Sequence, residues 1–160
     1  MSRVRVRVLF VCLGNICRSP LAEIVVAGQA AKRGLNETFH FASAGTGSWH
    51  IGNDADHRSA QTAKDHGLDL SNHRAQQITA AKVGQWDWFV AMDASNYSDL
   101  LRMGVPEERL LLMRQFEPNH ERVLDVPDPY YGGPDGFEDA YRMLCENADR
   151  LLDYLEAEAL

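Results

Sequence analysis

The stretch Val8-Leu-Phe-Val-Cys-Leu-Gly-Asn-Ile-Cys-Arg-Ser-Pro20 decides the fold, because it joins a buried strand directly to a helix. Residues 8–11 are continuously apolar, which is typical of a central parallel strand covered on both faces. After a short loop, the pattern predicts a helix from about Pro20 to Arg33. Ser19 is a suitable N-cap, proline suits the first helical position, and Gly34 ends the helix.

Further strands and helices alternate along the rest of the chain. We expect strands over residues 38–43, 86–92 and 110–113, helices over residues 54–66, 94–103 and 137–155, and a helical turn near residues 80–83. The alternation predicts an α/β fold: one domain over residues 1–160, with a four-stranded parallel sheet flanked by helices on both faces. Ligands gather at the carboxyl ends of such strands, so we expect Cys12, Ser43 and Asp93 to share one rim.

The composition is that of an ordinary globular protein, with 45% hydrophobic and 24% charged residues among 160. A net charge of −7 argues against broad nucleic-acid binding, which usually needs a basic surface. No segment resembles a signal peptide or a transmembrane span, so no membrane partner is expected. The three cysteines form no CxxC pair and no zinc-ligand pattern, which favours a reducing, cytoplasmic location and no bound metal. We expect a monomer, with weak self-association at most.

The loop between the first strand and the first helix has the chemistry of an anion site. Its backbone N–H groups lack partners, and together with the helix dipole they attract negative charge. The same field, with Arg18 nearby, favours the thiolate form of Cys12, to which Ser19 can donate a hydrogen bond. The planar guanidinium of Arg18 can bind two phosphoryl oxygens at once. Gly14 and Asn15 tolerate the backbone angles of a tight loop.

A plainer interpretation of this loop is a buried structural cysteine followed by a solvated arginine. The Cys-x5-Arg spacing alone is a weak motif, because so short a pattern also arises by chance. The apolar strand before it and the Ser-Pro helix start after it favour the anion site.

Beyond this local chemistry, residues 8–23 resemble the low-molecular-weight protein tyrosine phosphatases almost letter for letter. The resemblance continues in the same order through Ser43-Ala-Gly-Thr-Gly47, Trp49, Met92-Asp-Ala-Ser-Asn96 and Asp128-Pro-Tyr-Tyr-Gly132, and so covers nearly the whole chain. The passage that ends Ser-Trp-His is most similar to bacterial, particularly actinobacterial, members. The resemblance implies a cysteine-dependent enzyme that hydrolyses phosphotyrosine in proteins, and small aryl phosphates, without a cofactor.

The resemblance also implies a role for each matching residue. Cys12 would be the nucleophile, Arg18 the phosphate clamp and Asp128 the general acid and base. The phosphate-binding loop would comprise Leu13, Gly14, Asn15, Ile16, Cys17 and Ser19. A supporting network would consist of Asn15, Ser43 and His73, and the substrate rim of Trp49, Tyr130 and Tyr131. Plainer interpretations remain: Asp128 as a turn residue beside proline, His73 as a loop histidine, and one of the tyrosines as core.

The remaining sulfur-containing residues have simpler expectations. The resemblance implies that Cys17 can form a reversible disulfide with Cys12, and packing alone is the alternative. Cys145 falls on the apolar side of the last predicted helix and is expected in the core. Core positions are likewise expected for Met92, Met103 and Met113.

Three other functions fit parts of the sequence. Arsenate reduction on this scaffold needs further cysteines as a relay, and none lies between Cys17 and Cys145. Phosphoarginine phosphatases typically carry threonine in place of Ile16, whose apolar side chain favours tyrosine. A module that binds phosphate without hydrolysing an ester is disfavoured, because Cys12, Arg18, Ser19 and Asp128 are all present. The Gly-x4-Gly-Lys-Ser/Thr pattern of P-loop NTPases is missing from the sequence.

Overall fold

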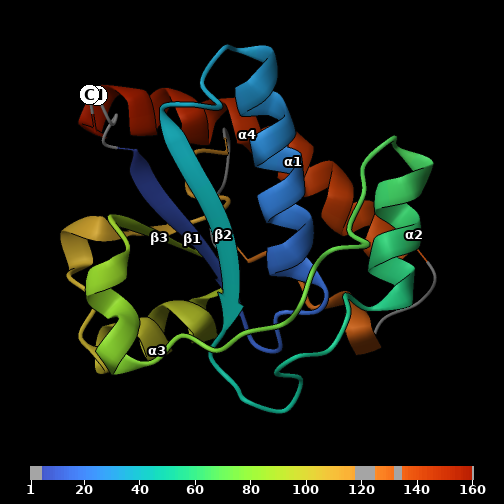
Figure 1. Ribbon diagram of the computed structural model, residues 1–160, viewed down its shortest axis with the longest axis horizontal. Helices are drawn as coiled ribbons and strands as arrows, with labels where there is room; N and C mark the ends of the chain where they lie inside the picture. Colours follow the sequence, from blue (N-terminus) through green and yellow to red (C-terminus); the bar gives the residue numbers. More distant parts are fainter. Residues whose placement is uncertain (1–4, 118–124, 132–134, 160) are drawn as a thin grey trace.

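Four parallel strands form the sheet at the centre of the computed structural model, which describes residues 5–117, 125–131 and 135–159 (Figure 1). They are β1 (Val6–Cys12), β2 (Phe39–Gly45), β3 (Trp88–Ala91) and β4 (Leu110–Leu112), in the order β2-β1-β3-β4. Because β2 and β3 flank β1 on opposite sides, the order reverses at β1. Such a switch point leaves a crevice at the carboxyl end of the central strand. The predicted four-stranded parallel sheet is confirmed.

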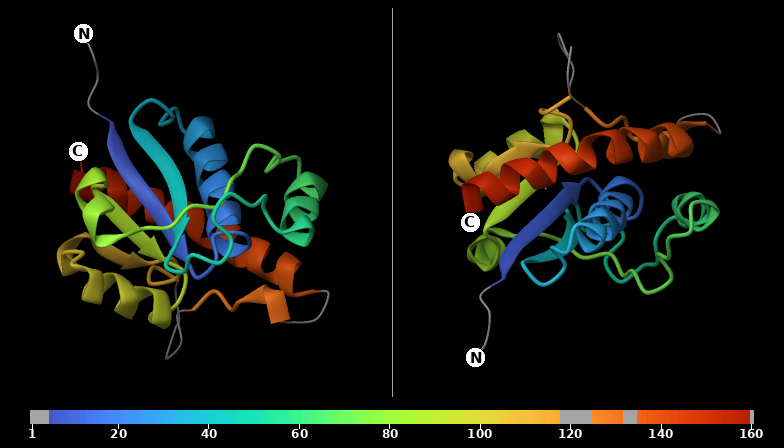
Figure 2. Two further views of the ribbon diagram at one scale, coloured as in Figure 1. Left: turned by 60° about the horizontal axis from the view of Figure 1, so that its bottom comes forward. Right: turned by 90° about the horizontal axis from the view of Figure 1, so that it is seen from above.

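Helices cover both faces of this sheet, as predicted. They are α1 (Arg18–Lys32), α2 (His57–Asp65), α3 (Ala94–Met103) and α4 (Gly136–Ala159), with the 3-10 turns η1 (Ala80–Gln85), η2 (Glu107–Arg109) and η3 (Pro129–Tyr131). Figure 2 shows α4 extending across one face of the sheet. Along β1, Val8 and Phe10 contribute to a core shared with α1 and α4, whereas Leu9 and Val11 belong to a core that includes Leu100 of α3. This alternation is the two-residue period of a strand buried on both faces.

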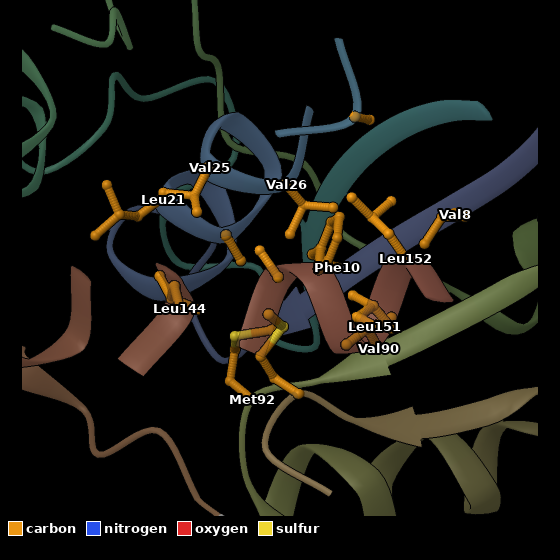
Figure 3. Packing of buried hydrophobic residues seen from close by; sticks show 14 of the residues in the cluster. Val8, Phe10, Leu21, Val25, Val26, Val90, Met92, Leu144, Leu151 and Leu152 are labelled. Atoms are coloured by element: carbon orange, nitrogen blue, oxygen red, sulfur yellow. The ribbon is translucent and has the colours of Figure 1, made fainter. Parts of the chain in front are cut away.

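The larger core, shown in Figure 3, packs one face of β1 against both α1 and α4. Phe10 of β1 lies among side chains of α1 and α4 that include Val26, Leu151 and Leu152, all four of them fully buried. Burial of one such side chain contributes about 1.5–3 kcal/mol to folding. The end of β1, which carries Cys12, therefore rests on a rigid base.

Two element boundaries near the loop differ from the sequence predictions. Helix α1 begins at Arg18, so Ser19 lies in its first turn and Cys17, rather than Ser19, occupies the N-cap position. Strand β2 extends to Gly45, because its pairing with β1 continues as far as Cys12.

The other elements overlap their predicted ranges. Helix α3 matches residue for residue and ends at Gly104, whose φ of 107° is left-handed. Helix α2 is shorter than predicted because the side chain of Asp56 accepts a hydrogen bond from the N–H of Arg58 and caps the helix there. Helix α4 continues past Leu155 to Ala159. Among the described residues, no helix has both the length and the apolar character needed to span a bilayer.

Two core predictions on sulfur-containing residues were wrong. Cys145 is exposed, because Leu144 and Ala148 form the buried side of α4 and Cys145 lies outside that side. Met103 is only partly buried and packs at the edge of the smaller core. Met92 and Met113 are fully buried, as predicted.

Candidate active site

Cys12, the last residue of β1, lies in a cavity of about 370 Å³. The cavity is also lined by Leu13, Gly14, Ile16, Cys17, Arg18, Trp49, His50, Asp128 and Tyr130. Cys12 itself is only 2% exposed, so a ligand approaches its sulfur through this cavity. The structure thus brings together the end of β1, the start of α1 and the segment before η3, the last of which only the family resemblance had implied.

The sulfur of Cys12 has two hydrogen-bond partners. The backbone N–H of Asn15 donates to it at 3.3 Å, and the hydroxyl oxygen of Ser19 lies 3.0 Å away. That hydroxyl oxygen accepts from Nδ2 of Asn15 at 2.8 Å, and its own proton has two acceptors within reach, the nearer sulfur and the carbonyl oxygen of Ala44 at 3.4 Å. Donors aimed at a sulfur stabilise negative charge on it.

Asn15 organises the loop that surrounds this sulfur. Its φ of 58° is the only positive value at a non-glycine position among the described residues. Its Nδ2 donates to Ser19 and to Ser43 (3.0 Å), and its Oδ1 accepts from the backbone N–H of Gln76 (2.9 Å). Nε2 of His73 lies 2.7 Å from its carbonyl oxygen. Since these polar groups are all paired, the loop geometry is set before a ligand arrives.

Two titratable groups support this network. A carbonyl oxygen can only accept, so the proton of the His73 imidazole resides on Nε2, where it donates to Asn15. Burial lowers the pKa of His73 below its usual value, and the hydrogen bond to Asn15 opposes this shift. Glu23 of α1 received no role in the sequence predictions. Burial raises the pKa of its carboxyl group, and a hydrogen bond with Ser43 opposes that rise.

Arg18 is held from three directions, and its side chain is only 3% exposed. Nη1 lies 2.6 Å from Oδ2 of Asp93 and donates to the carbonyl oxygen of Val126 at 3.0 Å. Nη2 lies 3.6 Å from Oδ2 of Asp128. Asp93 also caps α3 through its other oxygen, which accepts from the N–H of Asn96. The sequence predicted Asp93 at this rim, and the structure shows that the same side chain also caps α3.

The start of α1 and the end of β2 complete the loop. Within the described part of the chain, no side chain caps α1 at Cys17, which leaves the first N–H groups of the helix for an anion. Gly45 approaches the loop so closely that a Cβ there would lie 2.6 Å from the carbonyl oxygen of Leu13. The backbone N–H of Gly47 donates to that same carbonyl at 2.9 Å. A glycine at position 45 is therefore a steric requirement of the loop.

Exposed aromatic side chains form the mouth of the cavity. Trp49 is 71% exposed and Tyr130 is 41% exposed. The indole of Trp49 lies against Gly47, where any side chain would collide with the ring. The backbone N–H of Tyr130 donates to Oδ1 of Asp128 at 3.0 Å, which orients the carboxylate. The side chain of the third predicted rim residue, Tyr131, lies outside the described residues.

Arg58 lies beside Tyr130, and His50 lines the cavity, although the sequence analysis did not single out either residue. The guanidinium of Arg58 lies over the rings of Tyr130 (5.2 Å) and Phe137 (4.7 Å) and forms two hydrogen bonds with the carboxylate of Asp56. Arg58 comes from α2, and only the tertiary structure places it beside η3. His50 lines the cavity directly. Its position immediately after Trp49 is the signal that could have identified it.

Cys17 lines the same cavity as Cys12, and both are free thiols. Burial raises the pKa of the Cys17 thiol well above its usual value, and the nearby carboxylates of Asp56 and Asp128 add to the shift. Cys17 is therefore held in its neutral form. No group of three or more His, Cys, Asp or Glu side chains that could hold a metal occurs in residues 5–117, 125–131 and 135–159.

A buried cysteine that receives hydrogen bonds at a helix N-terminus, next to a buried arginine and a carboxylate, defines the class of cysteine-dependent phosphoric monoester hydrolases. Residues 7–160 match the family model described as low molecular weight phosphotyrosine protein phosphatase. Low molecular weight protein-tyrosine phosphatase A of Mycobacterium tuberculosis is 39% identical, over 93% of this chain and 91% of that protein. The corresponding phosphatase of Streptomyces coelicolor is 43% identical over 86% of each chain.

Solved structures are similar over the whole length. A protein tyrosine phosphatase from Entamoeba histolytica has a TM-score of 0.88 and 35% identity, covering 97% of this chain and 99% of its own. A Drosophila arginine phosphatase has a TM-score of 0.84 and 34% identity, covering 94% of this chain and 98% of its own. The chain therefore belongs to the low molecular weight phosphotyrosine protein phosphatase family.

Proposed function

We propose that this protein-tyrosine phosphatase uses Cys12 as nucleophile, Arg18 as phosphate clamp and Asp128 as general acid and base. The observation that carries the proposal is that Asp128 lines the same cavity as Cys12 and Arg18, although it comes from a segment far from them in the sequence. We further propose that residues 1–160 act as one cytoplasmic, monomeric domain whose partners are phosphotyrosine-containing proteins.

In the first step, the Cys12 thiolate attacks phosphorus in line with the tyrosyl oxygen. The S–P bond forms as the P–O bond breaks, and the carboxylic acid of Asp128 gives its proton to the leaving phenolate. Arg18 and the loop N–H groups bind the remaining phosphoryl oxygens throughout. Donation from Ser19 to the sulfur, at 3.0 Å, stabilises the thiolate before attack and when it leaves again.

In the second step, water hydrolyses the phosphocysteine. The Asp128 carboxylate accepts a proton from the attacking water, the S–P bond breaks, and Cys12 returns to a thiolate with release of inorganic phosphate. The hydrogen bond from the N–H of Tyr130 holds Oδ1 of Asp128, so that Oδ2 remains on the side of Arg18. One carboxyl group thus serves both steps without moving far.

The shape of the cavity supports phosphotyrosine over shorter substrates. Cys12 is buried at its base, whereas Trp49 and Tyr130 are exposed at its mouth, and a phenyl ring spans this depth better than the short side chain of phosphoserine. The apolar side chain of Ile16 in the wall suits an aromatic ring better than a guanidinium. Phosphoarginine remains the alternative substrate to test.

The test is a hydrolysis panel without added metal, in which phosphotyrosine, phosphoserine and phosphoarginine are compared at equal concentration. We expect selective turnover of phosphotyrosine. A preference for phosphoarginine would contradict the role given to Ile16 but keep the cysteine mechanism. No turnover of any substrate by the reduced protein would refute the proposal.

Single substitutions distinguish the roles of Asp125 and Asp128, the two acidic residues of the segment before η3. Cys12→Ser should abolish turnover, and Asp128→Asn should lower kcat by about 10²–10⁴-fold, the usual contribution of general acid catalysis. Asp125→Asn is the matched control, because the Asp125 side chain accepts from the N–H of Ala94, as an amide oxygen also can, and Asp125 does not line the cavity. Equal losses in both aspartate variants would exclude Asp128 as the specific proton donor.

A further inference from the structure

A second hollow lies directly beside the catalytic cavity. It has a volume of about 430 Å³ and is lined by Leu13, Thr46, Gly47, Trp49, Asp99, Arg102 and Met103. We call it the flanking hollow. Two of its lining residues, Leu13 and Trp49, also line the catalytic cavity. The two spaces are therefore separated by a wall that consists of these two side chains.

The side chains of this wall are open to solvent. Leu13 is 40% exposed and Trp49 is 71% exposed, and together they place exposed apolar surface between two hollows, an arrangement typical of a binding site. A phosphotyrosine in a protein continues into a chain on both sides, and that chain must cross the rim of the cavity. Successive residues are about 3.8 Å apart, so a residue next to phosphotyrosine that crosses the wall reaches the neighbouring hollow.

The lining of the flanking hollow combines apolar surface with one pair of opposite charges. Leu13, Trp49 and Met103 supply apolar surface, and methionine adapts its shape to varied partners. Its charged side chains, Asp99 and Arg102, form an ion pair three residues apart on α3. Because the two charges are adjacent and opposite, they give the hollow no net charge that would favour an acidic or a basic side chain.

We propose that the flanking hollow binds a large apolar side chain next to phosphotyrosine in the protein substrate, and thereby selects among phosphotyrosine sites. The inference rests on the proposed function, since it assigns a substrate subsite to that same cavity. Apolar surface on the wall supplies affinity, and the Asp99–Arg102 pair disfavours charged flanking residues, which would compete with a pair already formed.

The test uses phosphotyrosine peptides that differ at one flanking position, which carries leucine, glutamate or lysine, placed in turn on each side. On one of the two sides, we expect kcat/KM for the leucine peptide to exceed the values for both charged peptides by about threefold to tenfold. Hydrolysis of p-nitrophenyl phosphate, which has no flanking residue, reports the chemistry alone. Its failure would refute the proposed function, whereas equal rates for all peptides would refute only the flanking hollow.

Two variants of the ion pair give opposite predictions. Asp99→Asn leaves the Arg102 guanidinium unpaired, so the ratio of kcat/KM for the glutamate peptide to that for the leucine peptide should rise. Arg102→Ala leaves the Asp99 carboxylate unpaired, so the corresponding ratio for the lysine peptide should rise. Each ratio is taken within one enzyme, and a general loss of activity therefore cancels.

The matched control is the pair Asp139–Arg142 on α4, which has the same three-residue spacing and lines neither space. Asp139→Asn and Arg142→Ala should leave both ratios as in the unmodified protein. Equally large changes of these ratios in the Asp139 and Arg142 variants would overturn the inference. So would a result in which Asp99→Asn and Arg102→Ala change the glutamate-to-leucine ratio, or the lysine-to-leucine ratio, in the same direction.

Discussion

Oδ2 of Asp93 lies 2.6 Å from Nη1 of Arg18, in an ion pair between residues 75 positions apart. The same carboxylate caps α3 by accepting from the N–H of Asn96. Arg18 is therefore positioned by a group that is itself fixed at a helix terminus. This pair links α1 to the turn after β3, on either side of the switch point in the sheet.

Replacement of Asp93 by asparagine should impair catalysis without unfolding the protein. Asparagine is also a good N-cap, so α3 should keep its start, while the charged contact that orients Arg18 is lost. We expect kcat to fall about tenfold, the equivalent of ~1.4 kcal/mol. Steady-state kinetics with an aryl phosphate measure this. Thermal unfolding serves as the control, and an unchanged kcat would mean that Val126 and the loop suffice to position Arg18.

Asn15 offers a test that separates backbone strain from hydrogen bonding. Asn15→Gly keeps the positive φ without strain but removes the side-chain amide, whereas Asn15→Ala removes the amide and adds the strain. We expect both variants to lose most activity, and the alanine variant to be less stable than the glycine variant by about 1 kcal/mol. Urea unfolding gives the difference. Equal stabilities would show that the left-handed backbone at this position is unstrained.

The pH dependence of stability should report the neutral state of His73. Its folded pKa lies below its unfolded value, near 6.5, so between these two values the unfolded chain binds more protons. The stability that neutral His73 contributes is fully present above the unfolded pKa and is lost as the pH falls through the folded pKa. The free energy of unfolding should therefore fall on acidification below about pH 6.5, and fall less in His73→Gln. The exposed His57, changed to glutamine, is the control, and identical profiles for all three proteins would contradict the prediction.

Arg58 should affect binding of aromatic substrates more than the chemical step. Its guanidinium lies over the ring of Tyr130, and Arg58→Met keeps much of the stem but removes the planar cation. We expect KM for phosphotyrosine to rise about threefold with a smaller change in kcat, and Arg58→Lys to recover only part of the loss. A selective loss of kcat would instead indicate that Arg58 acts by positioning Asp128.

Mild peroxide should connect the two cysteines of the cavity. Peroxide oxidises the Cys12 thiolate to a sulfenic acid, and the thiol of Cys17 then displaces water to form a disulfide. Because Cys17 is held neutral, we expect oxidation to begin at Cys12. Mass spectrometry of peptides should find the Cys12–Cys17 bridge in the unmodified protein and Cys12 sulfinic acid in Cys17→Ala. Sulfinic acid at Cys12 in both proteins would count against a disulfide between Cys12 and Cys17.

The sequence by itself determined the features that depend on near neighbours. The apolar run of residues 8–11 predicted the central strand, and the loop that follows predicted the anion site, because strand burial, a helix start and a left-handed asparagine are all local properties. The α/β alternation predicted the sheet. One boundary differs: the sequence predicts Ser19 at the N-cap of α1, but the helix begins one residue before Ser19, and the Ser19 hydroxyl lies beside the sulfur of Cys12.

Only the tertiary structure decided how distant segments meet at the cavity. The hydrogen bond between His73 and Asn15 joins residues 58 positions apart, and the contact of Arg58 with Tyr130 joins α2 to η3. No pattern in the sequence specifies such pairs, because they depend on how whole elements pack against the sheet. The exposure of Cys145 has the same origin: the helical period predicted an apolar face, and the packing of α4 decided which edge of that face is covered.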